Sequence, residues 1–232
     1  MFDGLYKCEY KAGPVHNRSV MFVRDGRMLG GNSAFAHVGT FEVVNNTVVG
    51  RVIGQRHAVN SNVSQLYGAD DDELIFRGRA VGDAYHFDAS PARLPDARMH
   101  SIMTRLDEES LPLPGIVGPG GIANGLYSIR IRALDGVEGG LTGVMILQDG
   151  RMLGGDAFFY YLGSYSSIQG RWKGEIVNQE HTAARGSIFG GYEVGIGFAG
   201  EFADGAASLE ATALAGKRSL RLAAHMKLLH RI

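Results

Sequence analysis

The sequence predicts an all-β protein made of two tandem antiparallel β-barrels with about eight strands each. An internal repeat, segments in which apolar and polar residues alternate, and pairs of turn-forming residues between those segments support this fold class. The composition agrees with it, because glycine supplies 34 of the 232 residues, about twice the usual share. Glycine at this density fits a chain with many tight turns and bent strands.

The repeat is the strongest of these observations. Residues 20–57 align with residues 144–181 at a constant shift of 124, without a gap, and 14 of the 38 aligned positions are identical. The longest identical run is Asp-Gly-Arg-Met-Leu-Gly-Gly, at residues 25–31 and again at residues 149–155. Seven consecutive identities indicate that the chain is a duplication of one domain.

The duplication sets the predicted domain boundaries. Residues 1–106 form the first barrel and residues 125–232 the second. Residues 107–124 are predicted to be a linker, because they hold three of the six prolines and several glycines. Such a stretch does not continue a strand or a helix.

Both copies begin with a predicted strand, because residues 5–11 and 126–132 alternate apolar and polar side chains with a period of two. The next strands are predicted to turn at Asp25-Gly26 and at Asp149-Gly150. Such a pair suits a type I′ hairpin turn, which needs positive φ at both central residues. The glycine pair at 30–31 predicts a bulge or sharp bend.

A second hairpin is predicted at Asn45-Asn46, matched by Gln169-Gly170. The remaining strands are predicted at residues 48–56, 73–81, 84–88 and 100–106 of the first copy and at residues 172–180, 192–202, 206–214 and 219–229 of the second. Sequential antiparallel strands in this number close into a barrel, which removes exposed edges.

Three motifs of the second copy resemble the GrlR family of small negative regulators of type III secretion. They are Gly-Leu-Tyr-Ser-Ile at 125–129, Gln-Asp-Gly-Arg-Met-Leu-Gly-Gly-Asp at 148–156 and Tyr-Leu-Gly at 161–163. The first copy departs from the pattern at Asn32 and His37, which stand where the second copy has aspartate and tyrosine. The match covers about the first half of each copy.

The resemblance implies lipocalin-like barrels with an apolar interior, in a family that dimerises and binds an activator protein. Members of the family usually have one barrel, so this chain is expected to be a pseudo-dimer fused into one polypeptide, which leaves open whether it also forms a homodimer. Fold alone does not determine function, and the matching motifs are turn residues.

Composition narrows the expected partners and location. The formal charge of −1 and the pI near 6.7 give no reason to expect binding to nucleic acid or to an anionic membrane. The single cysteine, Cys8, cannot form a disulfide within the chain, and the N-terminus lacks the pattern of a secretory signal. The sequence is therefore expected to be soluble and cytoplasmic.

An aromatic cluster in the second copy supplies the candidate ligand-binding residues. Phe158, Tyr160, Tyr165 and Trp172 are predicted to line an apolar pocket inside the barrel, and packing of the core explains the same cluster as well. Two other segments, one with Val20 and Phe22 and one with Val144 and Ile146, have apolar residues on both faces of their strands. Val20, Phe22, Val144 and Ile146 are accordingly predicted to meet a partner barrel or a covering loop.

No group of residues predicts catalysis, a metal site or a cofactor. The duplicated histidines, His57 and His181, are interpreted as strand-end residues because no metal ligand accompanies both. The acidic run at 70–73 lacks the spacing of a calcium loop and is predicted to be a solvated turn. Cys8 is expected to be a half-buried cysteine and not a nucleophile, because nothing places a base beside it.

Two functions follow from these observations. The first is a non-enzymatic binding protein that acts like the GrlR family, by sequestering a protein partner such as a transcriptional activator. The alternative is a carrier or sensor of a small apolar ligand held inside a barrel.

Overall fold

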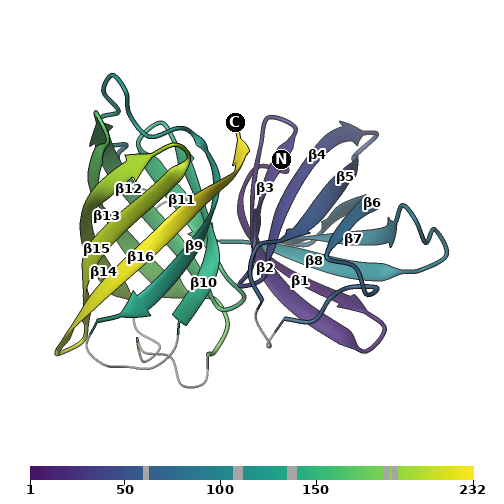
Figure 1. Ribbon diagram of the computed structural model, residues 1–232. Coiled ribbons are helices and arrows are strands. Elements are labelled where there is room, and N and C mark those ends of the chain that lie inside the picture. Colours follow the sequence, from purple (N-terminus) through teal and green to yellow (C-terminus); the bar gives the residue numbers. More distant parts are fainter. Residues whose placement is uncertain (60–62, 107–111, 135–139, 185–188, 190–192) are drawn as a thin grey trace. The chain divides into compact units, whose positions relative to one another are not determined.

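The computed structural model describes residues 1–232 except 60–62, 107–111, 135–139, 185–188 and 190–192. The chain divides into two compact units, Met1–Glu108 and Glu109–Ile232. Each unit contains a closed antiparallel barrel of eight strands (Figure 1), which confirms the predicted fold class. The described residues include no helix that could cross a lipid bilayer.

The first barrel closes where its first and last strands pair, with Cys8 opposite Met103. Its strands follow one another around the barrel in sequence order. They are β1 (Gly4–Ala12), β2 (Val15–Arg24), β3 (Arg27–Gly31), β4 (Phe35–Val44), β5 (Thr47–Arg56), β6 (Asp71–Val81), β7 (Ala84–Pro91) and β8 (Met99–Arg105).

The second barrel repeats this topology and closes through pairing of its first and last strands, which place Ile129 opposite Met226. Its strands are β9 (Gly125–Ala133), β10 (Gly140–Gln148), β11 (Arg151–Gly155), β12 (Phe159–Ile168), β13 (Arg171–Glu180), β14 (Val194–Ala203), β15 (Ala206–Ala215) and β16 (Arg218–Arg231).

The predicted hairpin turns are confirmed by their backbone angles. Asp25 and Gly26 have φ of 50° and 75°, and Asp149 and Gly150 have φ of 49° and 84°. The pairs at 45–46 and 169–170 also have positive φ at both residues. These are the angles that a type I′ turn requires.

The glycine pair after the first hairpin allows two strands to approach closely. A Cβ atom on Gly30 would lie 2.1 Å from the carbonyl oxygen of Val20, and Gly31 has φ of 151°. Pairing between β2 and β3 continues through both glycines without a register shift, so the pair forms no bulge there. The second copy repeats this geometry, with Gly154 against Val144 and φ of 155° at Gly155.

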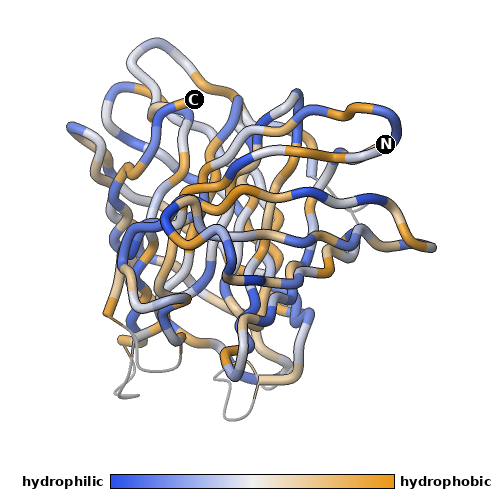
Figure 2. The backbone as a smooth tube through the Cα atoms, turned by 90° about the vertical axis from the view of Figure 1, so that its right-hand side faces the viewer, coloured by the Kyte–Doolittle hydropathy of each residue, from blue (hydrophilic) through white to orange (hydrophobic). Residues whose placement is uncertain are grey.

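Alternation along the strands builds one apolar core inside each barrel, because successive side chains point to opposite faces. Apolar and polar segments accordingly follow one another along the backbone (Figure 2). The first core includes Tyr6, Met21 and Phe76. The second includes Tyr127, Met145 and Trp172.

The stretch predicted as a linker makes ordered contacts within the second unit. The backbone N–H of Gly115 donates to the carbonyl oxygen of Gly150 at 3.0 Å, and that of Gly118 donates to Ser167 at 2.8 Å. Ile122 is buried in the core of the second barrel. Residues 107–111 of this stretch lie outside the described residues.

Several predicted boundaries need adjustment. The acidic run at 70–73 is not a separate turn, because β6 already begins at Asp71 and pairs with β5. The strand predicted at 192–202 begins at Val194, and residue 192 lies outside the described residues.

Candidate ligand site in the first barrel

The first barrel contains a partly open cavity of about 100 Å³. Its wall is mainly apolar, and Ser64, Leu66, Ala69 and Asp70, from the segment that follows β5, line part of it. An engineered apolar cavity of about 150 Å³ binds benzene, so a cavity of about this order suits only a very small molecule. Apolar side chains that line it include Met21, Met28, Val52, Phe76, Phe87 and Met103.

At three inward positions that line the cavity, the first copy has a smaller side chain than the second copy. The two barrels share their strand register, so the positions correspond: His37 pairs with Gly54, and Tyr161 pairs with Asn178. Another inward position has valine in the first copy and isoleucine in the second. The three matched pairs are His37 and Tyr161, Val52 and Ile176, and Gly54 and Asn178.

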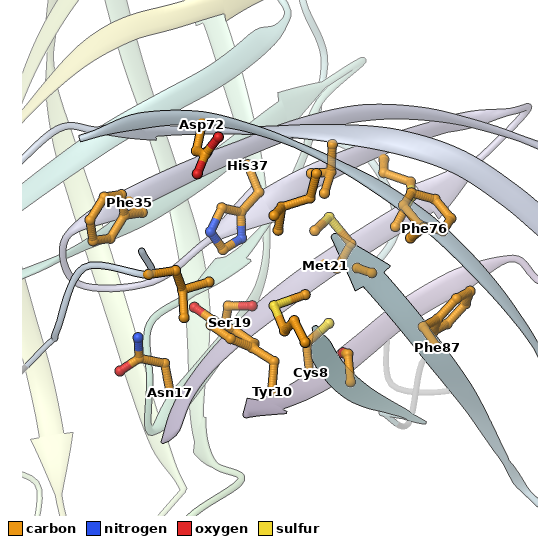
Figure 3. Close-up of a pocket in the computed structure, with 18 of the residues that line it drawn as sticks. Cys8, Tyr10, Asn17, Ser19, Met21, Phe35, His37, Asp72, Phe76 and Phe87 are labelled. Atoms are coloured by element: carbon orange, nitrogen blue, oxygen red, sulfur yellow. The ribbon is translucent and has the colours of Figure 1, made fainter. Parts of the chain in front are cut away.

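Polar groups gather at one side of the cavity. Figure 3 shows the ends of Tyr10, Ser19 and His37 close together, with Phe76 and Phe87 toward the other side. The rings of Tyr10 and His37 lie 6.2 Å apart. The cavity is therefore amphipathic.

Ser19 and His37 keep hydrogen-bonding capacity for a ligand. Ser19 is 1% exposed, and no described residue meets hydrogen-bond geometry at its Oγ, although the hydroxyl lies near enough to Cys8 and Tyr10 to lower the pKa of both slightly. The described residues likewise form no hydrogen bond with the His37 ring. Buried polar groups are normally paired, so Ser19 has capacity that a ligand or water would satisfy, and the half-buried His37 ring has capacity as well.

Three titratable groups in the cavity, those of His37, Cys8 and Tyr10, are neutral at physiological pH. Burial, with a smaller contribution from His57, lowers the pKa of His37 to about 4. Burial raises the pKa of the Cys8 thiol to about 12 and also raises the pKa of Tyr10. A neutral imidazole offers one donor and one acceptor, and a protonated thiol is a poor nucleophile, so the arrangement suits binding better than nucleophilic catalysis.

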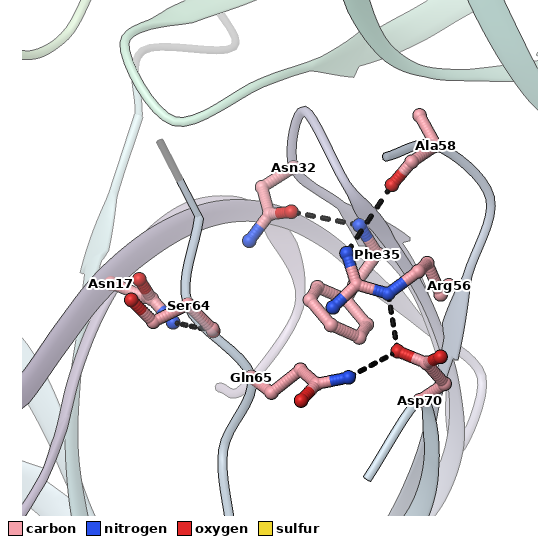
Figure 4. A network of polar contacts seen from close by, with 8 residues as sticks. All are labelled: Asn17, Asn32, Phe35, Arg56, Ala58, Ser64, Gln65 and Asp70. Carbon is pink, nitrogen blue, oxygen red and sulfur yellow. Dashed lines mark hydrogen bonds and ion pairs between the residues drawn. The ribbon is translucent and has the colours of Figure 1, made fainter. Parts of the chain in front are cut away.

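Polar contacts hold residues 64–70 against the first barrel (Figure 4). On one side, Asn17 Nδ2 donates to the carbonyl oxygen of Ser64 at 2.8 Å. On the other side, Arg56 forms an ion pair with Asp70, and Gln65 Nε2 donates to Asp70 Oδ1 at 2.6 Å. Strands β2 and β5 thus both anchor this segment.

The duplicated histidines hold equivalent turns. His57 Nε2 lies 3.0 Å from the carbonyl oxygen of Asn32, and His181 Nε2 lies 3.4 Å from that of Asp156. The backbone N–H of His57 also donates to the carbonyl oxygen of Ala34, and that of His181 donates to the carbonyl oxygen of Phe158. These contacts give both duplicated histidines a structural role.

The acidic run is paired with arginines. Asp70 pairs with Arg56, and Asp72 pairs with Arg93 at 3.1 Å. In the part of the chain that the structure describes, no three His, Cys, Asp or Glu side chains gather into a metal-binding group.

The predicted aromatic ligand residues separate in the structure. Tyr165 and Trp172 lie in the core of the second barrel, with ring centroids 6.3 Å apart. Tyr160 lies on the opposite face of β12 from its core neighbour Tyr161, and its hydroxyl bonds to the Gln179 side chain. Phe158 precedes β12 and packs partly buried against the core.

The four residues predicted to meet a partner point out of their barrels. Their strand neighbours belong to the interior cores, namely Met21 and Val23 in β2 and Met145 and Leu147 in β10. Since alternate side chains face opposite sides, the predicted residues occupy the outer face. These are Val20, Phe22, Val144 and Ile146.

Comparison with known proteins identifies no family. No family model and no curated protein matches the chain. Solved structures match over most of the chain, but with TM-scores too low to support any inference.

Three such structures are similar in this limited sense. A Bacteroides fragilis protein described as an outer membrane protein is 8% identical, with 97% of this chain and 96% of that chain covered and a TM-score of 0.26. A mutant of transferrin-binding protein B from Haemophilus parasuis is 9% identical, with 98% and 66% covered and a TM-score of 0.27. Aeromonas veronii immune modulator A is 9% identical, with 97% and 94% covered and a TM-score of 0.24.

The cavity was not predicted because the richest aromatic cluster, which supplied the predicted ligand residues, lies in the second copy. The missed residues are Tyr10, Ser19 and His37. One signal was present in the aligned repeat. The first copy has glycine at position 54 where the second copy has asparagine, and its cross-strand partner at position 37 is histidine where the second copy has tyrosine.

Proposed function

We propose that this chain is a non-enzymatic binding protein whose first barrel carries or senses a small, largely apolar molecule. The cavity of about 100 Å³ in that barrel is the observation that supports the proposal. A pocket with mostly apolar walls and a few convergent polar groups is the usual form of a small-molecule site.

The nature of the wall supports the same proposal. Met21, Met28, Met99 and Met103 all line the cavity. Methionine has three rotatable bonds and adapts its shape to a ligand, so the cavity can enlarge around a molecule somewhat larger than its resting volume.

Native mass spectrometry of the full chain, before and after organic extraction, tests the proposal. We expect additional mass that extraction removes. The double variant Val52→Ile with Gly54→Asn introduces the second copy's residues, and a Cβ on Gly54 meets only ordinary contacts, so it should fold but carry no additional mass. The control Val49→Ile makes the same valine change on the outward face of β5 and should retain it.

The proposal fails if the purified chain carries no extractable mass and also binds no added benzene in a calorimetric titration. It fails equally if the filled double variant binds as much ligand as the native chain, because the ligand would then lie elsewhere.

A second candidate is sequestration of a transcriptional activator protein, as in the GrlR family that the sequence resembles. Ile53 and Ile75 favour it: they are 49% and 59% exposed and lie diagonally opposite on β5 and β6. Exposed aliphatic side chains that lie together suit a protein interface. Replacing both with aspartate should abolish capture of the activator from the native host, whereas the filled double variant should preserve it.

A further inference from the structure

We propose that the first-barrel cavity selects an uncharged molecule with an apolar body and one hydroxyl or carbonyl group, and that Ser19 and His37 bind this polar group. This inference rests on the proposed function, because it specifies the chemistry of the molecule that the cavity would hold.

The division of the cavity into two ends defines the orientation of the ligand. Tyr10, Ser19 and His37 stand at one end, and Phe76 and Phe87 stand at the other (Figure 3). An apolar body is stabilised against the phenylalanines, because it leaves water without losing hydrogen bonds. The polar group of the ligand then lies at the end with Ser19 and His37.

The unpaired groups at the polar end match a hydroxyl or a carbonyl. Ser19 Oγ has no partner of hydrogen-bond geometry among the described residues, and its burial makes this state unfavourable. Asn32 Nδ2 donates to the Tyr10 hydroxyl at 2.9 Å, which leaves the Tyr10 proton available to donate. A ligand hydroxyl, which both donates and accepts, satisfies Ser19 and the neutral His37 together.

The charges around the cavity exclude ionised ligands. The residues that line it include no lysine or arginine, so a bound carboxylate would have no cation beside it. Its two carboxylates, Asp70 and Asp72, are already paired with Arg56 and Arg93, so an ammonium group would find no unpaired anion. An unpaired charge is strongly unfavourable in an apolar enclosure.

Isothermal titration of the full chain at pH 7 with benzene, phenol and benzoate tests the inference. We expect phenol to bind about ten-fold more tightly than benzene, the effect of one additional hydrogen bond, and benzoate not to bind. Ser19→Ala and His37→Phe should each bring phenol to within about two-fold of benzene. Ser164→Ala, on the outward face of β12, should leave the ratio unchanged.

Ser19→Gly provides a second variant in case the alanine variant does not fold, because the second copy has a glycine at the matched position, Gly143. Equal binding of benzene and phenol by the native chain would overturn the inference and leave the proposed function standing, as would binding of benzoate as tight as that of phenol. Failure of all three probes, with no extractable mass on the purified chain, would overturn both.

Discussion

Asn32 and Asp156 hold equivalent turns in the two barrels through one side-chain oxygen that accepts two backbone hydrogen bonds. In each case the donors are the N–H groups two and three residues further along the chain. The distances are 2.9 Å for both bonds to Asn32 Oδ1, and 2.7 and 2.9 Å for those to Asp156 Oδ1. The turn therefore depends on an oxygen acceptor and not on a negative charge.

The remaining atom of each side chain bonds to a tyrosine hydroxyl. Asn32 Nδ2 donates to Tyr10 at 2.9 Å, and Tyr161 donates to Asp156 Oδ2 at 2.8 Å. The Asp156 side chain is buried, and burial raises the pKa of its carboxyl group. The second barrel thus buries a carboxyl group at the position where the first barrel has the neutral amide of Asn32.

Asp156→Asn should change the free energy of unfolding by less than about 1 kcal/mol, because an amide keeps the two bonds from the backbone. Asp156→Ala should lower it by about 2–4 kcal/mol, since it leaves buried donors without a partner. Urea unfolding of the second barrel measures both. Because the pKa of Asp156 is raised in the folded chain, its contribution to the free energy of unfolding is lost as pH rises through that pKa. Asp156→Asn should remove this pH dependence. Equal losses in the two variants would contradict this account.

The pKa of His37 makes the first barrel sensitive to acid. Between pH 6.5 and about pH 4 the unfolded chain binds a proton at this histidine and the folded chain does not. The free energy of unfolding should therefore be complete above pH 6.5 and fall by up to about 3 kcal/mol as pH approaches 4. His37→Tyr, which introduces the residue of the second copy, should remove this part of the pH dependence. An unchanged profile in that variant would show that other groups cause it.

The chain has one reporter for each barrel. Cys8, its single cysteine, is buried in the first barrel, and Trp172, its single tryptophan, is buried in the second. Burial keeps Cys8 protonated, so we expect a thiol reagent at pH 8 to react much more slowly with Cys8 in the native chain than in the unfolded chain. Immediate labelling of the native chain, at the rate of a small free thiol, would show that Cys8 is accessible.

The glycines at 30 and 154 should each be necessary for one barrel. A Cβ atom at Gly154 would lie 2.2 Å from the carbonyl oxygen of Val144, a contact that the backbone cannot relieve cheaply. We expect Gly154→Ala to cost at least about 3 kcal/mol in an unfolding experiment followed by Trp172 fluorescence. Gly30→Ala should destabilise the first barrel in the same way and so speed the labelling of Cys8.

Gly197→Ala is the matched control for these variants. Gly197 lies within β14 with no atom near the position of a Cβ and without a positive φ, so alanine should be neutral or stabilise by about 0.5 kcal/mol. A loss as large as that of Gly154→Ala would mean that strand glycines matter here for a reason other than close approach.

The candidate site was harder to predict than the strands. Whether Trp172 fills a barrel or lines an empty pocket depends on all its neighbours, and the alternation of its strand says only that it faces inward. The second barrel packs it against Phe198, with ring centroids 4.7 Å apart. The side chains of Tyr160 and Tyr165 point to opposite faces of β12, because residues five apart along a strand face opposite sides.

The sequence by itself determined the all-β class, the duplication and the hairpin turns. These depend on local physics: a period of two along a strand, and residues such as Asp25-Gly26 that accept positive φ. Only the tertiary structure decided which barrel has room inside it. A cavity is the difference between the space that eight strands enclose and the summed volume of their inward side chains, so small changes such as Val52 for Ile176 become visible only when all the strands are in place.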